Sequence, residues 1–275
     1  MSNVIVILIF FFSIGQINAQ KIDELVDIMA QVNEVHDSAV GVAGIKTEQF
    51  KAFEKLKELV TIDELVELTN HPNPVITCYA SWGLVDKNYN RLEIVFSQLL
   101  KRNEKVAIYY GCQGKFLTIK ESLYLKYFNK LLNQMDSPFY QVSTDSQLFK
   151  LDSLILFDDN ISETLLNHAF ENNTFGGKFL ERIKFIAFEQ KKFVAMKYIF
   201  NNHRNCCEER LAEELLLYLG NNQYVHHNIY REIFSMLFFF DNEELREVIF
   251  LRLKILFAMG IFPTSEKEYE TYLKK

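Results

Sequence analysis

The chain has 275 residues, of which 49% are hydrophobic, and its formal net charge is −6. This length and apolar content are sufficient for a large buried core and exclude a disordered protein. Only 10 glycines and 4 prolines occur, so the residues that form turns between short strands are scarce and the composition predicts helices. Lys and Arg are spread along the chain without a basic block, which argues against nucleic-acid binding.

An apolar run, Val4–Ile14, precedes Lys21, the first charged residue of the chain. These 11 residues are too few to span a bilayer, which takes about 20 helical residues. We therefore expect residues 1–19 to be a signal peptide that is cleaved after the small residue Ala19. Cleavage would export the protein to the periplasm or the extracellular space without a stable membrane span. An uncleaved membrane anchor and a buried first helix stay open as alternatives.

Segments with helical apolar spacing follow from Ile22 onward, and several begin with a capping signal. Thr61 and Thr118 each begin a capping box, and Asn73 followed by Pro74 is expected to start a helix that runs to about Asp86. Further start signals occur at Ser162, Asp241 and Ser265. Two apolar stripes precede these signals: Ile22, Leu25, Met29, Val32 and Val35, and then Phe50, Phe53, Leu56 and Val60.

The longest polar break covers residues 137–147 and begins with Ser137 and Pro138. A proline followed by hydroxyl and amide side chains is typical of a loop. We therefore place a boundary here, with helical repeats over residues 20–137 and a C-terminal helical region over residues 138–275 that packs on the first.

A weak internal repeat is found when the chain is offset by 31 residues, which aligns Ala80 with Gly111 and Gly83 with Gly114. Small residues at matching positions suit helices that approach closely, so the alignment predicts a second two-helix unit. The alternative is a chance match between two amphipathic helix pairs.

The stretch from Leu65 to Leu84 resembles the HEAT-like repeat family, including HEAT-type modules of exported bacterial proteins. A first helix ends in an Asn/Pro turn, and Val75, Ala80 and Leu84 then follow the family pattern Val-x4-Ala-x3-Leu. The resemblance covers about residues 45–115. It implies an all-α fold of stacked antiparallel helix pairs, a HEAT-like α-α superhelix that can close into a compact helical domain in its C-terminal half. It also implies a scaffold or binding surface and carries over no catalytic residue.

Cysteine and histidine give a poor signal for a metal site. His203, Cys206 and His226 are spaced so that they can converge on zinc, but the chain has neither Cys-x2-Cys nor His-x3-His. A solvated turn explains residues 201–205 equally well, so we predict no metal and no cofactor. Cys78 and Cys112 are expected to be buried free thiols, while the pairing of the four cysteines, Cys78, Cys112, Cys206 and Cys207, is left open.

No catalytic motif is present, so we expect a protein that is not an enzyme. Glu208, Glu209 and Glu213 lie on adjacent turns of a predicted helix, but Arg210 between them predicts a solvated, salt-bridged face. The alternative is an all-α enzyme in which these carboxylates gather with His203 and His226 in a cleft.

Aromatic residues are abundant, and Tyr79, Trp82 and Tyr110 fall close together in the repeat. Core packing explains such a cluster, but tyrosine and tryptophan are also favoured anchors at protein interfaces. We choose these three as candidate binding residues of an exported interaction protein whose partner is another protein. The apolar segment 245–259 is predicted to form a helix that is buried on two sides.

Overall fold

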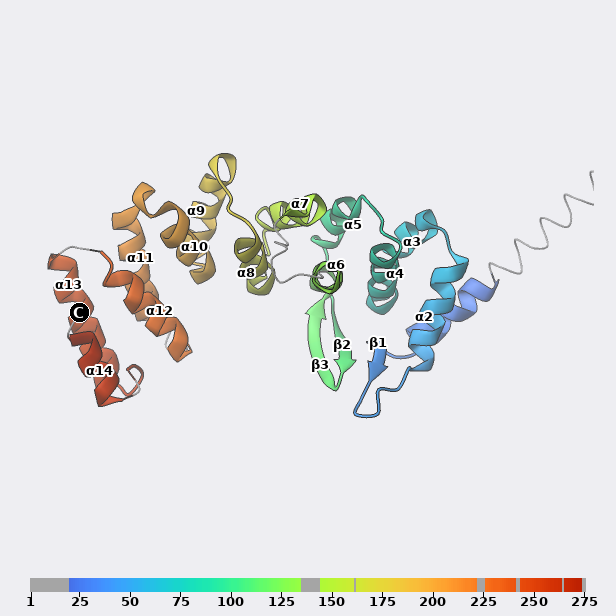
Figure 1. The fold of residues 1–275 in the computed structure, drawn as a ribbon, viewed down its shortest axis with the longest axis horizontal. Coiled ribbons are helices and arrows are strands. Elements are labelled where there is room, and N and C mark those ends of the chain that lie inside the picture. Colours follow the sequence, from blue (N-terminus) through green and yellow to red (C-terminus); the bar gives the residue numbers. More distant parts are fainter. Residues whose placement is uncertain are drawn as a thin grey trace, which may run out of the picture. The chain divides into compact units, whose positions relative to one another are not determined.

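The computed structural model describes residues 20–134, 144–160, 162–221, 226–240, 243–263 and 265–273 (Figure 1). These residues are predominantly helical and their helices pack against one another, so the predicted all-α class is confirmed. The contacts divide the chain into two compact units, Met1–Asp159 and Asn160–Lys275. The predicted signal peptide, residues 1–19, and the predicted boundary between residues 137 and 138 lie outside the described residues. Among the described residues, no helix is both long enough and apolar enough to cross a membrane.

Unit 1 combines helices with a small sheet. Its first helix covers residues 20–30, and its sheet has the order β1-β2-β3. The strands are β1 (Glu34–Val40), β2 (Lys105–Gly111) and β3 (Gln113–Thr118). The other helices are α2 (Glu48–Leu59), α3 (Ile62–Leu68), α4 (Pro74–Asp86), α5 (Leu92–Leu99), α6 (Ile119–Asn133) and α7 (Ser146–Ile155).

The predicted start signals of unit 1 are confirmed. Thr61 and Thr118 form complete capping boxes at α3 and α6, in which the threonine hydroxyl accepts from the third helical amide and a glutamate reaches back to the cap. The Asn73 side chain accepts from the amide of Val75, and Pro74 is the first residue of α4. These caps satisfy amides that the helices themselves leave unpaired, so the local sequence determines where each helix begins.

Helix α4 is the centre of unit 1. Its residues from Val75 to Val85 are all buried, and it contacts α3, α6, β1 and β2. A Cβ atom at Gly83 would lie 3.1 Å from Cδ2 of Leu65 in α3, so the close helix approach predicted at this glycine is confirmed. A helix surrounded in this way has no solvent-exposed face, which explains why its sequence is predominantly apolar.

The predicted second repeat is wrong from Lys105 onward, because this segment forms the hairpin of β2 and β3. Strand β2 pairs in parallel with β1 and antiparallel with β3. Gly111 has a φ of +56° in the two-residue turn that it forms with Cys112. Position 114 has no room for a side chain, because a Cβ atom there would lie 2.8 Å from Cε1 of the Tyr109 ring. The first predicted apolar stripe does not form a single helix, because the first helix ends at residue 30 and Val35 belongs to β1.

All the described secondary-structure elements of unit 2 are helices. The side chain of Ser162 caps its first helix as predicted, and the Ser265 hydroxyl accepts from the amide of Glu268, whereas the predicted cap Asp241 lies outside the described residues. The helices are α8 (Glu163–Asn172), η2 (Gly177–Phe179), α9 (Leu180–Phe188), α10 (Phe193–His203), η3 (Arg204–Cys206), α11 (Glu208–Asn221), α12 (His227–Leu237), α13 (Glu243–Ala258) and α14 (Glu266–Leu273).

Helix α13 is buried on one side only, so the prediction of burial on two sides is wrong for it. Ile249, Leu253 and Leu256 are buried. Four apolar residues on its opposite side are exposed: Val248, Leu251, Ile255 and Met259.

Candidate functional site

Two of the three predicted aromatic binding residues, Tyr79 and Trp82, belong to the core of unit 1, whereas Tyr110 of β2 is partly exposed. Tyr79 and Trp82 of α4 are both 0% exposed, so the prediction that they contact a partner is wrong. Trp82 donates its Nε1 hydrogen to the hydroxyl of buried Ser122 over 2.9 Å, and its ring stacks on that of Tyr110 at 6.0 Å between centroids. The Tyr110 hydroxyl is buried with no hydrogen-bond partner among the described residues, and burial raises its pKa. The cluster therefore packs the sheet against α4.

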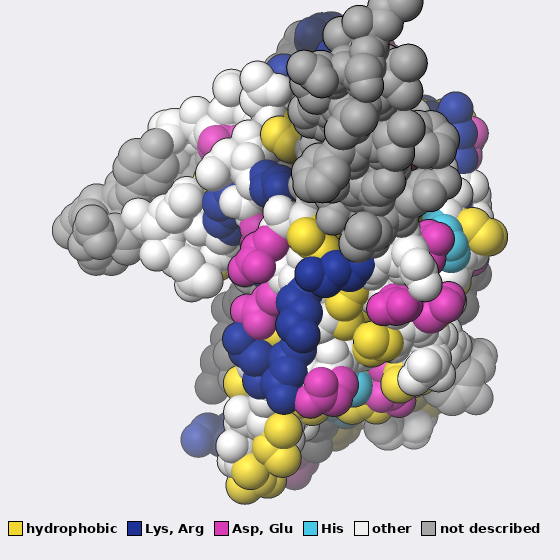
Figure 2. Space-filling view, turned by 90° about the vertical axis from the view of Figure 1, so that its right-hand side faces the viewer, with side chains coloured by type: hydrophobic (Ala, Val, Ile, Leu, Met, Phe, Trp, Pro, Cys, Tyr) yellow, Lys and Arg dark blue, Asp and Glu magenta, His cyan; other side chains and the backbone are white. Residues whose placement is uncertain are grey.

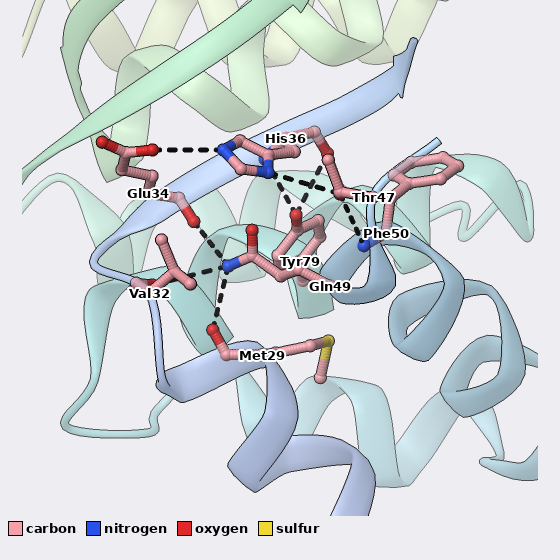
Figure 3. Close-up of polar contacts among 8 residues, drawn as sticks. All are labelled: Met29, Val32, Glu34, His36, Thr47, Gln49, Phe50 and Tyr79. Atoms are coloured by element: carbon pink, nitrogen blue, oxygen red, sulfur yellow. Dashed lines mark hydrogen bonds and ion pairs between the residues drawn. The ribbon is translucent and has the colours of Figure 1, made fainter. Parts of the chain in front are cut away.

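Tyr79 holds the outer edge of β1 (Figure 3). Its hydroxyl donates to the carbonyl of His36 over 3.0 Å and accepts from the amide of the same residue over 2.8 Å. Burial is the main cause that raises the pKa of Tyr79, so the hydroxyl keeps its proton and can donate. A single side chain thus satisfies both backbone groups of a strand residue.

Gln49 of α2 fixes the chain where it enters β1. The Gln49 side-chain nitrogen lies 2.9 Å from the carbonyl oxygen of Met29 and 2.6 Å from that of Glu34 (Figure 3). Both are acceptors at the turn that joins the first helix to the strand. The Oε1 atom of Gln49 is buried with no partner among the described residues.

A carboxylate, an imidazole and a hydroxyl lie in line beside this edge. Nε2 of His36 is 3.1 Å from Glu34, and Nδ1 is 3.3 Å from Oγ1 of Thr47 (Figure 3). Hydrolases use this order of groups to activate a nucleophile. Here, however, the Thr47 oxygen also accepts from the amide of Phe50 as the cap of α2. We therefore assign the three groups a structural role, in which Thr47 caps α2 and His36 links this cap to Glu34 of β1.

Charges of both signs are mixed on the face that Figure 2 shows, which lies to the right in Figure 1. Lys and Arg form a short row there, with Asp and Glu on both sides. Ion pairs of this kind occur at α2, where Lys51 lies 2.7 Å from Glu48. Such mixing favours solubility over the binding of phosphates.

The candidate zinc ligands are engaged separately. Nε2 of His203 is 2.8 Å from the carbonyl of Phe175, and His226 caps α12 through its side chain. The sulfur atoms of Cys206 and Cys207 are 3.1 Å apart. In the described part of the chain, no three His, Cys, Asp or Glu side chains form a group that could hold a metal ion. Of the other cysteines, Cys78 is buried as predicted but Cys112 is exposed.

A groove of about 570 Å³ between α11 and α13 is the best candidate binding site. Its rim carries the carboxylates of Glu208, Glu209 and Glu213 from α11 and Glu244 from α13. Its apolar lining comes from Ala212, Phe240, Leu245 and Val248. The volume is within the ordinary range of ligand sites, roughly 300–1,000 Å³.

The rim carboxylates lack the cations that the sequence suggested. Arg210 lies 2.6 Å from Glu189 at the end of α9 and stacks on Phe188, so the predicted solvated salt bridge forms with this glutamate and not with the rim carboxylates. Glu214, the neighbour of Glu213, is 2.5 Å from Lys191 and is largely buried. None of the four rim glutamates has an ion pair within the described residues.

An apolar stripe continues the groove along α13. Val248 lies in the groove, and Leu251, Ile255 and Met259 follow at helical spacing. Leu251 is 60% exposed and Met259 58%. The sequence carried a signal for this surface, because segment 245–259 holds more apolar positions than one buried face can use.

No protein-family model matches this chain, and neither a curated protein nor a solved structure is similar to it.

Proposed function

We propose that this chain is a non-enzymatic interaction protein in which stacked helix pairs of the HEAT-like kind present a binding groove. The partner is a protein that offers a basic amphipathic helix to the groove between α11 and α13. The observation that carries this proposal is the combination of four glutamates without cations and an apolar lining that continues as an exposed stripe. Basic residues of the partner would pair with the rim, and its apolar face would cover the stripe.

The length of the stripe defines the length of the partner segment. From Val248 to Met259 the helix rises by about 16 Å, since each residue adds about 1.5 Å. A partner helix of about three turns covers that distance, with apolar anchors three and four residues apart. Contiguous exposed apolar surface of this kind marks interaction sites in monomeric proteins.

Binding of model peptides tests the groove. We would measure fluorescence anisotropy with a labelled 14-residue amphipathic Leu/Lys helix and with a Leu/Glu helix of the same apolar pattern. The Leu/Lys peptide is expected to bind and to weaken as salt is added, because the rim attraction is screened. Equal binding of both peptides, or of neither, would contradict the proposal.

Charge reversal at the rim supplies the matched control. Glu208→Lys together with Glu213→Lys is expected to abolish binding of the Leu/Lys peptide. Glu266→Lys together with Glu270→Lys makes the same charge change at two exposed positions of α14 and should leave binding unchanged. If this α14 variant weakens binding as much as the rim variant, net charge rather than the groove attracts the peptide.

A second candidate function is an enzyme, and the convergence of Glu208, Glu209 and Glu213 on one groove favours it. The histidines that this hypothesis added, His203 and His226, do not line the groove. A hydrolytic activity lost on Glu213→Gln, with peptide binding retained, would favour the enzyme over the interaction protein.

Export is part of the proposal and depends on the sequence alone. The apolar run before Lys21 and the small residue Ala19 support a cleaved signal peptide. N-terminal sequencing of the mature protein tests this: a start at Gln20 supports export, and retention of Met1 contradicts it.

A further inference from the structure

Two adjacent cysteines lie together at the surface of unit 2. Cys206 ends η3 and is exposed, and Cys207, which precedes α11, is partly exposed. Their sulfur atoms are 3.1 Å apart, and both residues are free thiols. A hollow of about 350 Å³ lies next to them, lined by residues 200–206. Cys206 lines this hollow and Cys207 is itself partly exposed, so a ligand can reach both residues from solvent.

The distance between the sulfur atoms can be compared with the geometry of the elements that two thiolates bind. With a bond of about 2.3 Å to each sulfur, as in zinc sites, a separation of 3.1 Å gives an angle of about 85° at the bound atom. A tetrahedral ion requires sulfur atoms about 3.8 Å apart, and a linear one about 4.6 Å, at the same bond length. The observed distance fits an atom with pyramidal geometry and bond angles near 90°.

We propose that Cys206 and Cys207 form a binding site for trivalent arsenic, a soft element that is pyramidal when it holds three ligands. Two ligands come from the protein, and the third is a hydroxide or a carbon substituent that arsenic already carries. The site therefore needs only two sulfur atoms, in agreement with the lack of a larger ligand group in the described part of the chain. Soft thiolate ligands favour such elements over hard cations.

The binding step releases water and involves no oxidation. With phenylarsine oxide, each thiol forms an As–S bond, and the two thiol protons leave with the oxygen of the reagent as one molecule of water.

Intact-protein mass spectrometry with phenylarsine oxide tests the site. We expect one adduct per chain, removal of the adduct by a dithiol, and resistance to the same concentration of a monothiol. Cys206→Ser and Cys207→Ser should each weaken the adduct by roughly 100-fold or more, because chelation by two thiols is replaced by one bond. Cys112→Ser removes an exposed single cysteine and should change nothing.

Three results would overturn the proposal. The first is an adduct that forms as tightly in the Cys206→Ser variant and in the Cys207→Ser variant as in the unchanged protein. The second is stoichiometric zinc bound at these cysteines from a solution of zinc chloride, since zinc needs the wider angle. The third is a protein that, isolated without reductant, carries these two cysteines as a disulfide that phenylarsine oxide cannot enter.

Discussion

Helices α4 and α13 are both apolar well beyond one face, but they have different surroundings. In α4, residues Val75 to Val85 are buried against other elements of unit 1. In α13, Ile249 and Leu253 are buried while Leu251 and Ile255, on the other side, face solvent. The contrast shows that a similar apolar composition can be fully buried or half exposed: among the described residues, other elements surround α4, whereas one side of α13 faces solvent.

The largest loss of stability is expected when a large buried side chain of α4 is removed. Trp82→Ala should lower the free energy of unfolding of unit 1 by about 3–5 kcal/mol, because a large fully buried ring is removed and Ser122 loses its donor. Chemical denaturation followed by circular dichroism measures this. Phe116→Ala removes an aromatic ring that is 78% exposed and should change stability little. Equal losses for the two variants would contradict the core assignment.

Disruption of a buried ion pair at α6 is expected to cause the next largest loss of stability. Nζ of Lys120 lies 2.6 Å from Asp158, and both side chains are almost fully buried. Lys120→Met leaves the carboxylate buried beside an apolar group and should cost about 3–5 kcal/mol. Fluorescence of Trp82, the only tryptophan, reports the unfolding of unit 1. Lys120→Met with Asp158→Leu should recover most of the loss, and exposed Lys101→Met should cost almost nothing.

Removal of the Tyr79 hydroxyl should have an intermediate effect. In Tyr79→Phe the ring still packs, but the amide and the carbonyl of His36 lose their partner, which should cost about 1–3 kcal/mol. Denaturation followed by Trp82 fluorescence measures the change. Tyr109→Phe removes a hydroxyl that has no hydrogen-bond partner among the described residues and serves as the control. A smaller loss for Tyr79→Phe than for the control would contradict the role of this hydroxyl.

The smallest effect on stability is expected on the exposed side of α13. Leu251→Ser with Ile255→Ser should change the free energy of unfolding by less than about 0.5 kcal/mol, because both side chains already face solvent. The same variant should weaken binding of the Leu/Lys peptide by roughly tenfold or more. Leu273→Ser, at an exposed position of α14, is the matched control. Unchanged peptide binding would show that the stripe is not part of the interaction surface.

Local signals in the sequence predicted the starts of α3, α4 and α6 in unit 1 and missed its sheet. Capping residues such as Thr61 and Thr118 act within one turn, so they can be recognised without knowledge of the rest of the fold. The hairpin also had a local signal, since the run from Val106 to Tyr110 is rich in β-branched and aromatic residues and a glycine turn follows. The repeat alignment outweighed that signal. The pairing of β1 with β2 joins segments about 70 residues apart and has no local signature.

The candidate groove was predictable only in part. The sequence placed Glu208, Glu209 and Glu213 on adjacent turns of one helix, and the structure confirms this. It suggested Arg210 as their partner, but the direction of an arginine side chain depends on the neighbouring helix, here α9 with Glu189. The addition of Glu244 and the apolar lining requires the packing of α13 beside α11, which no spacing within either helix specifies.

The Tyr79 hydroxyl also influences how the protein resists aggregation. Unpaired strand edges are templates for assembly with other chains. At β1 the edge is closed by Tyr79 at His36 and by the bridge between Val40 and Ile45. Among the described strands, this leaves the outer side of β3 without a partner, where Lys115 supplies the charge that deters pairing. Substitutions that neutralise this lysine should therefore promote fibrillar assembly sooner than any change at β1 that keeps Tyr79.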